Sequence, residues 1–276
     1  MVGAHPALIL AAALAQFMPS ADLGLAGGLL DAPLALAELD AIAVPVPAEA
    51  ELAIGGALAP DQAIDLAPHG SVLGIYAPEA AAPVLRVDAV THRVGPVYHA
   101  MTTGAPPSDL GGTMALAIEL LVAEHLRNVE GGIDLLDVRC HGAGGDLVLA
   151  VKLRQRVEGQ AKTALIAALS SPATWPKLAI GVDEDIDAAD LRDVFWSAAS
   201  RTHAERDVGM IDGVRAHPHD PASPRDGGPN GDRLATRWFI DSTMPPLTQL
   251  ERRETFARAT PRNLRDVALA DFLPPE

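Results

Sequence analysis

Two residues with reactive side chains, Cys140 and His141, are adjacent in the sequence. A cysteine and a histidine work as nucleophile and base only when their side chains lie within hydrogen-bond reach. The surrounding residues predict a strand, in which neighbouring side chains point to opposite faces. We therefore expect Cys140 to be a buried structural cysteine and the pair to carry no nucleophilic chemistry.

An acidic run at residues 183–187 invites comparison with a calcium-binding loop. An EF-hand loop needs glycine at its sixth position and glutamate at its twelfth. Counted from Asp183, those positions hold alanine and valine, which excludes an EF-hand. We interpret the run as the acidic end of a strand that leads into a helix, with Asp187 as its N-cap and Asp190 as an acid in its first turn.

A pair of histidines, His217 and His219, has the residue type that binds transition metals. They lie in a stretch, residues 215–234, that is rich in proline, glycine, aspartate and arginine, with no companion ligands close in sequence. Such composition predicts a flexible loop. We interpret the two histidines as incidental to metal binding.

The glycine-rich segment at residues 142–145 follows a predicted strand, as a phosphate-binding loop does. The residues after it predict another strand, so the helix N-terminus that would bind the anion is missing. We expect a hairpin turn here. Reasoning from reactive residues alone thus reaches an α/β protein without an assigned activity.

The predicted secondary structure changes near a proline-rich linker at residues 104–107, from mostly strands to alternating helices and strands. The first part is expected to contain one helix and mostly strands. The helix is predicted at residues 6–17, followed by a break at glycines 24, 27 and 28 and by strands at 34–46 and 51–58. A further strand pair is predicted at 84–93 and 97–103, turned at Gly95.

After the linker, expected helices alternate with expected strands, a pattern that indicates an α/β layer fold. The helices are predicted at residues 113–128, 159–170 and 188–200, and the strands at 133–139, 147–153, 177–182 and 208–211, the last being the final strand. From residue 246 onward the chain is predicted to be helical, with an interruption at Pro261. Five arginines in this tail predict either a docking segment or a solvated helix face.

Composition and charge limit the partners and the cellular location that we expect for this protein. The formal net charge of the 276 residues is −15, and no lysine or arginine precedes Arg86. Such a field repels phosphate backbones and anionic lipid, so we expect neither nucleic acid nor a membrane as partner. Cys140 is the only cysteine, and no apolar run reaches the roughly 20 residues of a membrane span. We reject a signal peptide, because no positive residue precedes the apolar N-terminal run, and predict a cytoplasmic protein.

Short motifs recur in order along nearly the whole chain. They lie at residues 2–7 (VGAHPA), 25–29 (LAGGL), 46–52 (VPAEAEL), 91–98 (THRVGPVY), 104–107 (GAPP), 182–187 (VDEDID), 191–196 (LRDVFW), 201–207 (RTHAERD) and 240–243 (IDST). Their order and spacing resemble those of the UbiD family of prenylated-FMN-dependent (de)carboxylases. The resemblance implies an α+β fold. Residues 1–103 would form a partial split β-barrel of the flavin-reductase-like type, 104–214 an α/β C-terminal oligomerisation domain, and 215–276 a loop and helical tail.

Departures from the family pattern bear on function. Family members bind prenylated FMN and a divalent metal through a region that precedes the first motif, and this sequence begins at that motif. Alignment of the turn at residues 66–76 places Leu66 and Ser71 where the family has its catalytic glutamates. Leucine exchanges no proton, and a lone serine hydroxyl titrates far outside the useful range. A family carboxylate that helps hold the metal aligns with Asp22, and we expect the chain alone not to bind the cofactor.

Three hypotheses follow from the resemblance. The first is a non-catalytic subunit that assembles with itself or with a catalytic UbiD-type decarboxylase acting on an aromatic or α,β-unsaturated carboxylic acid. The second is an active carboxy-lyase that uses Asp22, His69 or a residue supplied by a partner as proton donor; His69 lies beside the positions of the glutamates, and histidine is the residue type used for proton transfer near neutral pH. The third is a folded remnant without activity.

Overall fold

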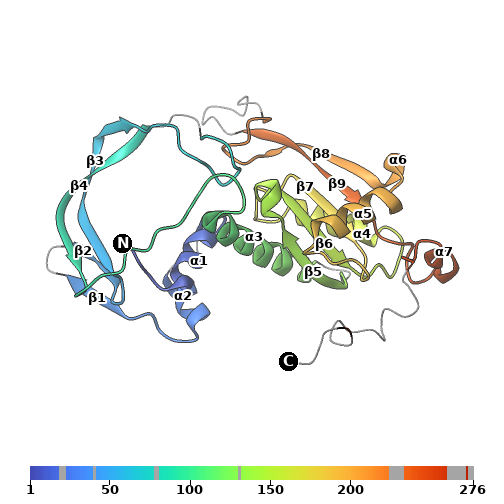
Figure 1. The fold of residues 1–276 in the computed structure, drawn as a ribbon, viewed down its shortest axis with the longest axis horizontal. Coiled ribbons are helices and arrows are strands. Elements are labelled where there is room, and N and C mark those ends of the chain that lie inside the picture. The colour runs from blue at the N-terminus through green and yellow to red at the C-terminus, as the bar shows by residue number, and fades with distance from the viewer. Residues whose placement is uncertain are drawn as a thin grey trace.

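The computed structural model of the chain describes residues 1–18, 23–39, 42–77, 81–129, 132–223, 233–259 and 272. The fold is mixed α+β. Figure 1 shows a long two-stranded ribbon at one end and a five-stranded sheet with helices at the other, with further helices between them. Asp22, Pro261 and most of the expected helical tail lie outside the described residues.

Helix α1 (Pro6–Ala15) begins where predicted, with Pro6 in its first turn and the His5 Nδ1 accepting a hydrogen bond from the Ala7 amide. The expected break at the three glycines is wrong, because they lie in helix α2 (Leu23–Leu30). Ala26 of α2 is fully buried against α1. This packing offsets the cost of about 1 kcal/mol that each glycine adds to a helix.

The strands of the first part form two separate antiparallel pairs. The predicted strand at 34–46 is instead a pair, β1 (Leu36–Leu39) with β2 (Ile42–Pro47), and β3 (Leu52–Asp65) pairs with β4 (Ala81–His92). The strand expected at residues 97–103 is absent. Its backbone is satisfied by side chains, since the Val97 amide donates to Glu51 and the Thr102 amide to Asp109. No closed barrel occurs among the described residues, and the barrel stays a prediction.

The second part contains one five-stranded sheet in the order β5-β6-β7-β9-β8. Its strands are β5 (Leu135–Cys140), β6 (Val148–Leu153), β7 (Leu178–Val182), β8 (Val208–Arg215) and β9 (Leu234–Asp241). The hairpin between β5 and β6 is confirmed, with the short 3₁₀ turn η1 (Gly142–Gly144) at its tip. The expectation that the strand near residue 208 is the last one is wrong. β9 follows it and inserts between β7 and β8.

Helices cover both faces of this sheet. Alternate residues of β6 point to opposite sides: Leu149 and Val151 pack beneath helices α3 (Asp109–Arg127) and α4 (Gln160–Leu169), whereas Ala150 faces helix α5 (Leu191–Arg201). Helix α1 also packs on α3 and thereby joins the first part to this core. The short helices α6 (Ala204–Asp207) and α7 (Leu250–Glu254) lie at the periphery.

Helix α5 begins one turn later than predicted. Its N-cap is Asp190, which accepts a hydrogen bond from the Arg192 amide, and Asp187 instead closes the preceding turn by accepting from the Ala189 amide. Asp190 is therefore the N-cap in place of Asp187, and the acid in the first turn is Asp193. The cause is the acid that follows, because Asp193 bonds the Asp187 amide and fixes the turn outside the helix.

Candidate functional site

The positions that resemble the family glutamates lie in a compact turn formed by residues 66–77, which we call the 66–77 turn. Leu66 is 37% exposed just beyond β3, whereas Ser71 is only 5% exposed. The Ser71 hydroxyl accepts a hydrogen bond from the Leu73 amide at 3.2 Å, and its backbone pairs with Ile75. The Ser71 side chain therefore closes the turn.

The 66–77 turn is pressed against the second part of the chain. A side chain at Gly145, in the β5–β6 hairpin, would meet the backbone of Leu73 at 2.9 Å, and one at Gly74 would meet Pro106 at the same distance. The Thr103 hydroxyl also donates to the Gly70 carbonyl. The turn is thus fixed at the junction between the linker and the sheet.

Histidines from distant segments come together beside this turn. His69 is exposed, and its charge acts on His219, whose pKa is lowered by burial and then by its positive neighbours. His217 is buried and packs edge-on against Trp175, with the two ring centroids 4.3 Å apart. Burial lowers the pKa of His217 to about 4. Sequence reasoning did not connect His69 with the histidines of the 215–234 stretch. Part of that stretch is anchored: the Lys177 ammonium pairs with Asp220 at 2.7 Å.

The described residues contain no group of three or more histidines, cysteines, aspartates or glutamates arranged to hold a metal ion. Asp22, the expected metal ligand, lies outside them. The acidic run beginning at Asp183 forms ion pairs instead. Asp183 pairs with Arg253, Glu184 with Arg154 at 2.7 Å, and Asp185 with both terminal nitrogens of Arg201. These contacts agree with its interpretation as structural.

A buried carboxyl that the sequence did not reveal lies under the β5–β6 hairpin. Asp146 is 0% exposed, has a left-handed backbone with φ of 61°, and neither carboxyl oxygen has a hydrogen-bond partner among the described residues. Burial, and secondarily the charge of Glu119, raises its pKa from 3.8 to about 7. Such a group has the pKa of a general acid or base, but its enclosure leaves no access for a substrate.

The neighbours of Asp146 are also buried. The Cys140 thiol donates to the Asp146 carbonyl at 3.6 Å, and burial raises the pKa of this thiol well above its ordinary value. The Glu119 carboxylate accepts from the Cys140 amide, and burial raises its pKa as well. Burial lowers the pKa of His141. The Nε2 of His141 has no hydrogen-bond partner among the described residues, and the expected burial of Cys140 is confirmed.

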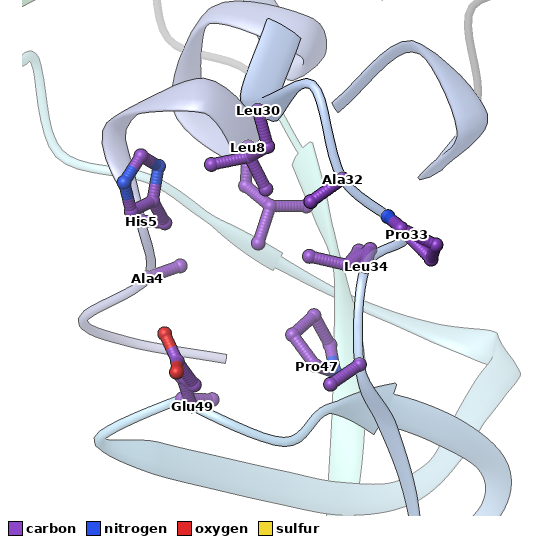
Figure 2. A pocket seen from close by; sticks show the side chains of 11 residues that line it. Ala4, His5, Leu8, Leu30, Ala32, Pro33, Leu34, Pro47 and Glu49 are labelled. Atoms are coloured by element: carbon purple, nitrogen blue, oxygen red, sulfur yellow. The ribbon is translucent and has the colours of Figure 1, made fainter. Parts of the chain in front are cut away.

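An apolar cavity of about 230 Å³ lies in the first part of the chain. Figure 2 shows His5 and Glu49 on one side of it and Leu34 and Pro47 on the other, with Leu8 behind. Neither Leu66 nor Ser71 of the 66–77 turn lines this cavity. Flavin nucleotides need a larger site, since ligand pockets span about 300–1,000 Å³, and a phosphate needs donors or cations. No lysine or arginine lines this cavity, so these residues do not fit the family cofactor.

The fold and its ordered motifs define the class. The model for the 3-octaprenyl-4-hydroxybenzoate carboxy-lyase Rift-related domain matches residues 1–106, and that for the C-terminal domain of the same carboxy-lyase matches residues 112–241. The structure is similar to that of the UbiD-class enzyme HmfF from Pelotomaculum thermopropionicum in complex with FMN, with a TM-score of 0.83 and 31% identity. That similarity covers 99% of this chain and 58% of HmfF. The chain belongs to the UbiD family.

Curated relatives are similar over comparable stretches. An anhydromevalonate phosphate decarboxylase from Methanocaldococcus jannaschii is 28% identical over 94% of this chain and 58% of its own length. A phenolic acid decarboxylase from Sedimentibacter hydroxybenzoicus is 28% identical over 76% of this chain and 42% of its own. The chain therefore spans about half the length of the relatives it matches. Within the described part of the chain, no helix is long and apolar enough to cross a membrane.

Proposed function

We propose that the chain is a non-catalytic UbiD-family subunit that assembles with a catalytic UbiD-type decarboxylase acting on an aromatic or α,β-unsaturated carboxylic acid. The observation that carries this proposal is the state of the 66–77 turn. Leucine occupies one position of the family glutamates, and the serine at the other position uses its hydroxyl to close the turn. Prenylated FMN and its metal would then be bound by the partner, in a cytoplasmic complex.

The buried titratable groups near the turn, Asp146 and His217, do not replace the glutamates that the family has there. Asp146 has a suitable pKa but no access for a substrate. His217 is kept neutral by burial and packs on Trp175. A proton donor must reach hydrogen-bond distance of the reacting atom, and neither side chain meets that condition in this conformation.

Assembly through the basic tail, one of the two expectations for the arginines, receives no support from the described part of the tail. Arg253 pairs with buried Asp183, and Arg258 pairs with Asp193 while lying over the ring of Trp196. These arginines fasten the C-terminal segment to the chain's own sheet, so a partner would have to bind elsewhere.

The test is affinity purification of the chain from its native host, followed by mass spectrometry and an absorbance spectrum of the eluate. The proposal predicts a second UbiD-class chain in fixed ratio together with a flavin absorbance band. A chain recovered alone and without colour would contradict it and favour a folded remnant.

A second candidate is an active carboxy-lyase that uses Asp22, His69 or a residue supplied by a partner as proton donor. It is favoured by His69, which is exposed on the 66–77 turn beside the positions of the family glutamates. Decarboxylation by the isolated chain with added prenylated FMN would support this candidate. A His69→Ala variant that retained the activity would exclude this histidine as the proton donor.

A further inference from the structure

One face of the β3–β4 ribbon is apolar along its length. Antiparallel pairing places Ile54 opposite Val90 and Leu58 opposite Leu85, so these side chains share a face, and Val87 lies between them opposite Gly56. Each of the five is 41–66% exposed. We call Ile54, Leu58, Leu85, Val87 and Val90 the apolar ribbon face.

The other face of the ribbon differs. It contains the small residues Ala53 and Ala59, both buried, and the polar residues Arg86 and Thr91. The larger apolar side chains thus gather on the exposed side. A two-stranded antiparallel sheet is marginally stable alone, and contiguous exposed apolar patches mark interaction sites.

The edges of the ribbon are also open. Apart from a single bridge between Val2 and Leu52, β3 and β4 pair only with each other in the described part of the chain. The outward backbone amides and carbonyls of each strand can therefore accept a further strand, as sheet edges do in strand addition.

We propose that the apolar ribbon face and its open edges are the docking surface for strands of the catalytic UbiD-class partner. This inference rests on the proposed function and names the surface that would serve it. The occupant is an extended segment with apolar side chains facing the ribbon and lysine or arginine at its rim.

Charge selects this occupant over a second copy of the chain. The two ribbon strands contain Asp61, Asp65 and Asp88 against the single arginine Arg86, and residues 1–85 contain nine acids and no lysine or arginine. Two copies docked through this part would bring acidic surfaces together, whereas a basic strand would meet complementary charge. The length of the related proteins agrees with this choice. HmfF is matched over 99% of this chain but only 58% of its own, so a UbiD-class chain contains further polypeptide able to supply such strands.

The experiment compares two variants that add the same charge to neighbouring exposed positions of β3. Leu58→Asp changes the apolar ribbon face, and Ala57→Asp changes the opposite face. The probe is the flavin-bearing UbiD-class chain recovered from the native host, produced recombinantly, and the readout is the dissociation constant from calorimetry. We expect Leu58→Asp to weaken binding by roughly 30-fold or more and Ala57→Asp by less than about threefold.

Hydrogen exchange is measured on the wild-type chain, so its result does not depend on whether a variant folds. The amides of β3 and β4 should become protected when the probe binds. Equal binding by both variants, with no new protection in the ribbon, would overturn the docking surface while leaving the proposed function intact. Failure of the wild-type chain to bind any flavin-bearing chain would overturn the proposed function and this inference with it. If the wild-type chain formed a dimer and Leu58→Asp abolished it, the occupant of the apolar ribbon face would be a second copy of the chain and the proposed partner would be wrong.

Discussion

Replacement of Asp146 by asparagine should change how the stability of the protein depends on pH. Asp146 is fully buried, and its carboxyl lacks a hydrogen-bond partner among the described residues. Asparagine is the matched substitution because it has nearly the same shape, stays neutral, and tolerates the left-handed backbone at φ 61°. The variant therefore removes only the ionisation.

The magnitude follows from the shift in pKa, which rises from 3.8 in the unfolded chain to about 7 in the folded one. Because the folded pKa is raised, folding favours the protonated acid. Stability is therefore lost as pH rises from about 4 through 7. The full shift corresponds to about 4 kcal/mol, of which about 2.5 kcal/mol falls between pH 5 and pH 8.

The assay is denaturant unfolding of the wild-type chain and Asp146→Asn at several values between pH 5 and pH 8. Glu119 and His141 are present in both proteins, so the difference between the two unfolding free energies reports the ionisation of Asp146 together with its coupling to Glu119. That difference should move in favour of the variant by about 2.5 kcal/mol as pH rises. Asp61→Asn, an exposed change on β3, is the control. A difference that stays constant with pH would refute the raised pKa and the burial that causes it.

Three further outcomes are expected. Arg201→Ala should lower the free energy of unfolding by about 3 kcal/mol, measured by denaturant titration, because it leaves the half-buried Asp185 carboxylate without its bidentate partner; a change below 1 kcal/mol would contradict this. Asp190→Ala should cost about 1 kcal/mol through loss of the α5 N-cap, and Asp190→Asn should restore most of it. Cys140 should react with a disulfide reagent only once denaturant is added, because burial encloses its thiol and raises the pKa; rapid reaction of the native protein would argue against that burial.

The second part of the chain was largely predictable because its patterns are local and strong. Continuous apolar runs predicted β6 and β7, and the glycines at residues 142–145 predicted the hairpin before β6. The insertion of β9 beside β7 was not predictable in this way. Strand order in a sheet is set by packing across the chain, and nothing in the residues of β9 specifies its neighbours.

The errors in the first part arise where tertiary contacts override local preference. Three glycines predicted a break, yet burial of Ala26 against α1 sustains α2. The alternating residues 97–103 predicted a strand, yet the carboxylates of Glu51 and Asp109 satisfy its amides. In both cases the deciding partner lies in another segment, which a pattern read along the chain does not include.

Asp146 was missed for the same reason. Its position after Gly145 at the end of a glycine-rich turn suits a left-handed backbone, so its conformation had a sequence signal. Its burial had none, because Gly111 of α3 lies against its carboxyl and the 66–77 turn packs on the adjacent Gly145, both from distant segments. A carboxyl in a turn is ordinarily exposed, and only the packing of three segments makes this one a buried acid.

Under the proposed function, the motifs that identify the family are kept in this chain while the residues that we align with its catalytic glutamates have changed. The acidic run is retained, and its carboxylates bind arginines from three other segments: Arg154 after β6, Arg201 at the end of α5 and Arg253 in α7. Arg201 and Asp183 are the buried members of two of these pairs, and leaving a buried charge without its partner is strongly destabilising, so folding alone favours keeping those two pairs. Leu66 is 37% exposed and forms no ion pair, so folding constrains its position less. Retention of the acidic run therefore indicates ancestry and fold, and activity must be argued from the 66–77 turn.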